Sequence, residues 1–144
     1  MRSGVLLDTG PLVAFLYRRD AYHDWAVETF VTFDSPAVTC EPVITEACFL
    51  IARNGQQANR VLDHVSRQHI RIGLTLDSEI DAIQALMRRY QSVPMSLADA
   101  CLVRLAEMTG SPICTLDADF AIYRADGRTP LTLITPGRRS LHEP

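Results

Sequence analysis

The sequence predicts one α/β domain, in which a mainly parallel central sheet is flanked by helices. Two observations lead to this prediction. Short apolar runs typical of buried strands alternate along the chain with longer segments whose apolar residues recur at helical spacing. The chain also has 144 residues, the length of a single domain, and can bury a core without disulfides or a structural metal.

The predicted strands are short apolar runs bounded by acids or turn-forming residues. They span residues 5–7, 37–40, 70–76, 113–116 and 131–134. Two of them end directly at an acid, Asp8 and Asp117. Because ligands bind beyond the carboxyl ends of the strands in parallel sheets, we expect both acids at the functional edge of the sheet.

The predicted helices carry apolar residues three or four positions apart. They span residues 12–17, 22–33, 43–53, 57–69, 77–90 and 97–109, with a short helix over 119–123. Pro11 is expected at the first position of the first helix. Asn54 and Gly55 are expected to end the third helix, and Ser96 and Gly110 to bound the sixth.

Composition fits an ordinary globular protein, with 47% hydrophobic and 22% charged residues. We expect a folded domain over residues 1–136 and a polar tail over 137–144. No apolar stretch approaches the roughly 20 residues that span a bilayer, and no signal peptide is recognisable. A cytoplasmic protein without a membrane partner is therefore expected.

Cysteine usage and net charge argue against two kinds of site. Cys40, Cys48, Cys101 and Cys114 lie in apolar stretches without a Cys-x-x-Cys pair, which indicates buried free thiols rather than zinc ligands or disulfides. The net charge is −3, and all 14 basic residues are Arg. Because proteins that bind nucleic acid only through phosphates are usually basic, a simple DNA-binding module is disfavoured.

The two acids at strand ends have the strongest claim to chemistry. A carboxylate at the end of a buried strand is costly unless it is paired, hydrogen-bonded or bound to a metal. Asp8 fits that description, although a turn cap would also explain it. Thr115 precedes Asp117 by two residues, so both side chains are expected on one face, with the hydroxyl beside the carboxylate.

Two further acids lie in predicted helices. Glu46 is surrounded by apolar helical neighbours, whereas the competing Glu41 reads as a first-turn charge that favours the helix dipole. Asp99 follows Ser96 in a Ser-x-x-Asp pattern, which predicts a capping box. A solvated face at Glu46 and a cap at Asp99 are therefore open alternatives to function. Clustered carboxylates suit Mg²⁺ or Mn²⁺, which can activate water and stabilise a phosphate leaving oxygen.

Four segments together resemble the PIN-domain ribonucleases, and especially the VapC-type toxins of toxin–antitoxin pairs. They are LLDTGPLVAFL, PVITEACFLI, SLADACLVRLA and TLDADF, and the resemblance covers nearly the whole chain. It implies that Asp8, Glu46 and Asp99 are the main catalytic, metal-binding acids, and that Asp117 is a more variable fourth. Relatives often carry another Asp where this chain has Ser96, which we leave outside the core set.

The resemblance also implies the chemistry and the partners. Thr9 and Thr115 match frequent hydroxyl positions around the metal, and Asp119 is expected as a helix cap or an outer contact. The implied activity is Mg²⁺- or Mn²⁺-dependent endonucleolytic cleavage of RNA. The implied partners are a VapB-type antitoxin that covers the acidic groove and a second copy of the chain in a homodimer.

Three other classes compete with this interpretation. Asp8-Thr9-Gly10 spells the aspartic protease signature, but that chemistry needs two such loops in mostly β surroundings. A haloacid-dehalogenase-type phosphatase would need a second Asp at Gly10 and a catalytic Lys, and the chain has no Lys. A catalytically inactive PIN-fold module that binds RNA or protein stays open, because fold alone does not prove activity.

Overall fold

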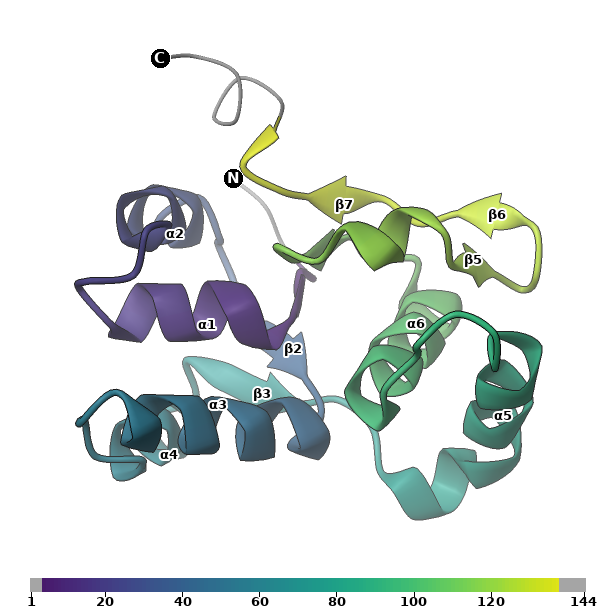
Figure 1. Ribbon diagram of the computed structural model, residues 1–144, viewed down its shortest axis with the longest axis horizontal. Helices are drawn as coiled ribbons and strands as arrows, with labels where there is room; N and C mark the ends of the chain where they lie inside the picture. Colours follow the sequence, from purple (N-terminus) through teal and green to yellow (C-terminus); the bar gives the residue numbers. More distant parts are fainter. Residues whose placement is uncertain (1–3, 138–144) are drawn as a thin grey trace.

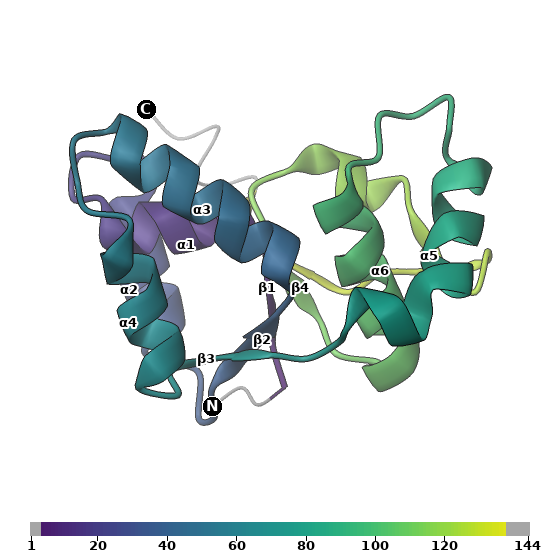
Figure 2. The same cartoon turned by 90° about the horizontal axis from the view of Figure 1, so that it is seen from below.

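The computed structural model describes residues 4–137 and contains a five-stranded parallel sheet with helices on both faces (Figures 1 and 2). The strand order is β3-β2-β1-β4-β7, and every neighbouring pair is parallel. The strands are β1 (Leu6–Leu7), β2 (Ala37–Thr39), β3 (Ile70–Ile72), β4 (Ile113–Cys114) and β7 (Leu133–Ile134). This architecture confirms the predicted α/β class.

The helices divide into two layers. They are α1 (Thr9–Leu16), α2 (His23–Phe30), α3 (Glu41–Arg53), α4 (Asn59–Ser66), α5 (Leu76–Arg89), α6 (Leu97–Thr109) and a 3₁₀ turn, η1 (Ala118–Ala121). Figure 2 shows α1 to α4 on one side of the sheet and α5 and α6 on the other. The chain leaves β1 toward β2 and leaves β4 toward β7, so the strand order reverses between β1 and β4. Such a reversal opens a crevice for ligands beyond the strand ends.

Two predicted helix boundaries have contrasting outcomes. Helix α6 has the predicted bounds, because Ser96 forms a capping box with Asp99 and Gly110 adopts a left-handed φ of 71° at the C-terminus. Helix α1 begins at Thr9, three residues earlier than predicted, because the Asp8 side chain caps it. Pro11 therefore occupies the third helical position, where a missing N–H is still harmless.

Several strand predictions were too long, and one hairpin was missed. β3 ends at Ile72, and Leu76, which was predicted to end that strand, instead begins α5. An antiparallel pair, β5 (Arg124–Ala125) and β6 (Thr129–Pro130), follows η1. Its turn holds Asp126 and Gly127 at φ values of 52° and 75°. This Asp-Gly pair is a known hairpin signal, so the sequence did contain the information.

Helix α6 has more buried residues than any other helix of residues 4–137, since it lies between the sheet and α5. Eight of its residues are buried, including Cys101, Leu102 and Leu105. On α5 the core face is formed by Ile83 and Leu86, whereas Ile80 and Met87, which recur at helical spacing with Ile83, are exposed. The four cysteines are free thiols, as predicted, and only Cys48 is partly exposed.

Residues 138–144 lie outside the described part of the protein, so the expected polar tail over 137–144 stays a prediction. None of the helices within residues 4–137 has the length and apolarity needed to cross a bilayer.

Gly73→Ala is expected to destabilise the fold by about 1–3 kcal/mol, as overpacked core sites do. Gly73 follows β3 and donates its N–H to the Thr39 carbonyl. A Cβ here would collide with the Val38 side chain and would lie 3.1 Å from Leu105. Urea unfolding measures the loss. Val38→Ala should cost less in the Gly73→Ala background than in the wild type, and simple additivity of the two losses would contradict the clash.

Candidate functional site

A cavity of about 830 Å³ opens at the carboxyl ends of β1 and β4, where the strand order reverses. Its lining comes from four different parts of the chain. The lining residues are Asp8, Thr9, Gly10, Thr45, Glu46, Phe49, Leu50, Ser96, Asp99, Leu116 and Asp117. The structure thus brings together all four acids that the sequence singled out.

Asp8 is the acid held most firmly, because its carboxylate accepts a hydrogen bond on each oxygen. The backbone N–H of Thr9 donates to Oδ1 at 2.8 Å, and the Thr115 hydroxyl donates to Oδ2 at 2.6 Å. Asp8 is only 7% exposed and Thr115 is fully buried. Asp8 therefore caps α1 and also lines the cavity, so the helix cap that was the alternative explanation is compatible with a place in the candidate site.

Glu46 reaches the same cavity from the middle of α3 and is exposed to solvent. The Thr9 hydroxyl donates to its Oε1 at 2.7 Å, which ties α3 to the first turn of α1. The competing acid Glu41 lies in the first turn of α3 and does not line this cavity. The two threonines predicted near the acids thus each hold one carboxylate.

Asp99 is 9% exposed and is fixed by the first turn of α6. Its Oδ2 accepts from the Ser96 N–H at 3.1 Å, while the Ser96 hydroxyl accepts from the Asp99 N–H at 3.0 Å. The Tyr123 hydroxyl donates to the same Oδ2 at 3.4 Å and is also 3.2 Å from the Pro94 carbonyl. Sequence reasoning missed Tyr123, because nothing in its local pattern links it to a residue 24 positions away.

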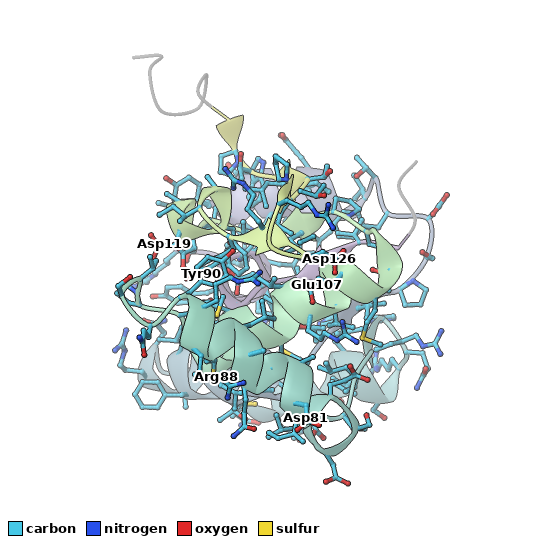
Figure 3. All side chains as sticks on the ribbon, turned by 90° about the vertical axis from the view of Figure 1, so that its right-hand side faces the viewer. Asp81, Arg88, Tyr90, Glu107, Asp119 and Asp126 are labelled. Atoms are coloured by element: carbon cyan, nitrogen blue, oxygen red, sulfur yellow. The ribbon has the colours of Figure 1, made fainter. Side chains whose placement is uncertain are left out.

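Asp117 is exposed and stands where β4 gives way to η1. Its N–H donates to the Thr115 hydroxyl at 2.9 Å, and its Oδ1 accepts from the Asp119 N–H at 2.9 Å. Asp117 is therefore the N-cap of η1. Of the two roles expected for Asp119, helix cap or outer contact, the cap is wrong and the outer contact stays a prediction. Figure 3 shows Asp119 at the outer edge of the molecule, and it does not line the cavity.

No cation neutralises this group of acids within the described chain. The ion pairs of residues 4–137 join Arg104 to Glu79 and Glu107, and none of these three residues lines the cavity. Burial, and then the negative charges of Asp99 and Asp117, raise the pKa of Asp8 to about 6 against the opposing hydrogen bonds from Thr115 and Thr9. Burial and the charges of Asp117 and Glu46 also raise the pKa of Asp99.

The donor chemistry of the cavity fits a hard divalent cation, but the acids are spread out. Carboxylate oxygens are the ligands that Mg²⁺ and Mn²⁺ prefer. Across residues 4–137, however, no three Asp, Glu, His or Cys side chains are placed to share one ion as they stand.

Comparison with known proteins places the chain in a family. The PIN-domain model matches residues 5–126, and the chain therefore belongs to the PIN-domain family. Among solved structures it is similar to VapC20 of Mycobacterium tuberculosis, described as a toxin that cleaves the sarcin–ricin loop, with a TM-score of 0.73 and 21% identity. The similarity covers 83% of this chain and 94% of that one. No curated protein matches the chain.

The raised pKa of Asp8 predicts a pH-dependent stability difference. Between its ordinary pKa of 3.8 and about 6, Asp8 is ionised in the unfolded chain but still protonated in the fold, so stability falls as pH rises through this range. In metal-free buffer, Asp8→Asn should gain stability relative to wild type from about pH 4 to 6, by up to about 3 kcal/mol.

Urea unfolding at a series of pH values in the presence of a chelator measures this difference. Asp81→Asn is the matched control, because Asp81 is exposed on α5 (Figure 3). A stability difference between Asp8→Asn and wild type that stays constant over the range would contradict the burial of an ionisable Asp8.

Proposed function

We propose that the protein is a divalent-metal-dependent endoribonuclease that hydrolyses RNA phosphodiester bonds, with Asp8, Glu46, Asp99 and Asp117 as catalytic acids. One observation carries the proposal: these acids line one cavity of a PIN domain at the switch point of its sheet, with no cation of the described chain among them. Buried unpaired carboxylates are costly unless a ligand compensates them. A metal ion is the ligand that offsets this charge and also permits a phosphate to approach.

Two of the four acids would form a fixed part of the metal site, and the other two would move to complete it. Asp8 and Asp99 are held by hydrogen bonds and would form the fixed half of a Mg²⁺ or Mn²⁺ site. Glu46 and Asp117 are exposed and would complete it by rotating inward, away from the hydrogen bonds that they accept from Thr9 and Asp119 in this structure. The bound ion would supply the charge that activates water and stabilises the leaving oxygen.

The threonines orient the acids rather than contact the substrate. Thr115 donates to Asp8 and accepts from the Asp117 N–H, so a single hydroxyl sets the positions of two acids. The Thr9 hydroxyl donates to Glu46 and so orients that one acid. Asp119, by contrast, contributes its backbone N–H, which holds the Asp117 carboxylate in place.

We further propose that the protein acts as a VapC-type toxin, with a VapB-type antitoxin as its partner and a homodimer as its assembly. The PIN-domain match and the similarity to VapC20 support this role. The competing function is an inactive PIN-fold module that binds RNA or protein. The presence of all four acids in the cavity favours the enzyme, since a module that only binds has no need of them.

Asp8→Asn and Asp99→Asn should each reduce RNA cleavage by at least about 100-fold, as is typical when a group that stabilises the transition state is removed. The measurement is cleavage of structured RNAs by the purified protein with Mg²⁺ or Mn²⁺, and again with a chelator. Asp81→Asn is the control and should cleave as wild type does.

Chelator-resistant cleavage would contradict the metal dependence. Full activity in both variants would contradict the site. Failure of the wild type to cleave any RNA with either metal would instead favour the binding module.

Expression of the wild-type chain should arrest growth, and co-expression of the neighbouring antitoxin gene product should relieve the arrest. The expected cause is RNA cleavage, so the Asp99→Asn chain should not arrest growth. Growth curves under an inducible promoter measure this. Equal arrest by Asp99→Asn would show that toxicity does not depend on the acidic cavity.

A further inference from the structure

A second polar cavity, about 490 Å³ in volume, lies at the C-terminal ends of α1 and α3. Arg18 and Arg19 follow α1, Asn54 and Gln56 follow α3, and Arg60 lies in the first turn of α4. All three arginines are exposed. This basic cavity therefore offers guanidinium and amide groups to a ligand, and it contains no acid.

The arginines of the basic cavity are not neutralised by the protein. The ion pairs found across residues 4–137 all belong to Arg104. Arg60 donates from Nη1 to the Gln56 side-chain oxygen at 3.1 Å, which orients it without offsetting its charge. Guanidinium groups without an ion-pair partner match phosphate oxygens in both charge and geometry.

An aromatic platform lies between the basic cavity and the acids. Glu46, Phe49 and Arg53 are three and four positions apart on α3 and so share one face of the helix. Phe49 lines the acidic cavity, yet its side chain is 63% exposed. The Arg53 guanidinium carbon lies 5.6 Å from the centroid of the Phe49 ring. An exposed ring backed by a cation is a stacking surface for a flat π-system.

The acidic cavity, the platform of Phe49 and Arg53, and the basic cavity form a line along the molecule. Helices α1 and α3 pack side by side and run in the same direction away from the acidic cavity (Figure 1). Because α1 has eight residues, it is about 12 Å long, so the basic cavity lies within a few nucleotides of the acids.

We propose that this line binds the substrate strand: an unpaired base next to the scissile phosphate stacks on Phe49 and Arg53, and the basic cavity of Arg18, Arg19 and Arg60 holds a phosphate farther along. The inference rests on the proposed ribonuclease function. It specifies single-stranded RNA, because bases in a duplex are not free to stack on a side chain. It also reconciles RNA binding with a net charge of −3, since the cations need only follow one path.

Binding is measured separately from cleavage, so that failure of one proposal is distinguishable from failure of the other. The probe is a short fluorescent single-stranded oligoribonucleotide of mixed sequence, titrated with full-length Asp8→Asn protein. In this background Phe49→Ala should weaken binding about 5- to 150-fold, and Phe49→Trp should restore it.

The salt dependence of binding tests the basic cavity. Arg18→Ala, Arg19→Ala and Arg60→Ala should each lower the slope of log K against log salt by about 0.7 for every phosphate that the variant no longer neutralises. Arg88→Ala is the matched control, because Arg88 is exposed on α5, on the other side of the sheet (Figures 2 and 3), and should leave the slope unchanged. Apart from the Asp8→Asn background that all proteins share, the substituted residues are exposed, and thermal melting verifies that each variant folds.

Three results would overturn the proposal. The first is an unchanged affinity for the oligoribonucleotide in Phe49→Ala. The second is an equal reduction of the slope in Arg88→Ala. The third is RNA binding that is unchanged in all these variants while binding of purified antitoxin is abolished in them, which would make the surface a protein-docking site.

Discussion

The hydrogen bond from the Thr115 hydroxyl to the buried Asp8 carboxylate joins the ends of two parallel strands at the place where the sheet changes direction. Fold and site both depend on this hydrogen bond. It fixes β4 beside β1, compensates part of the cost of burying a charge, and positions Asp117 through its N–H. The remaining electrostatic cost is visible in the raised pKa of Asp8, and under the proposed function a cation would offset it.

Three of the acids serve structure and site at once. Asp8 caps α1, Asp99 closes the capping box of α6, and Asp117 caps η1. Each helix or turn therefore begins at the cavity, with backbone N–H groups that hold the carboxylate in position and favour its negative charge. A helix cap and a place in the candidate site, treated as competing explanations at the level of sequence, are here two properties of the same side chain.

Local signals in the sequence predicted a large part of this arrangement. Asp8 and Asp117 were placed by strand ends, and the bounds of α6 by a capping box and a glycine. Glu46 and Asp99 needed the family resemblance, because a solvated face and a cap explained them equally well. Tyr123 could not be predicted, since its hydrogen bond with Asp99 exists only after the chain between them has folded. The spacing of the acids also depends on side-chain rotamers, which sequence patterns do not encode.

The capping box at Asp99 has an evolutionary consequence. A substitution there removes an acid of the proposed site and also loosens the start of α6, at a cost of about 1 kcal/mol for a missing cap. Glu46 is exposed and caps no helix, so its loss leaves the fold nearly intact. If a lineage no longer needs the activity, drift will therefore remove Glu46 before Asp99. Relatives that have lost only this glutamate are the ones most readily retained as stable, inactive scaffolds.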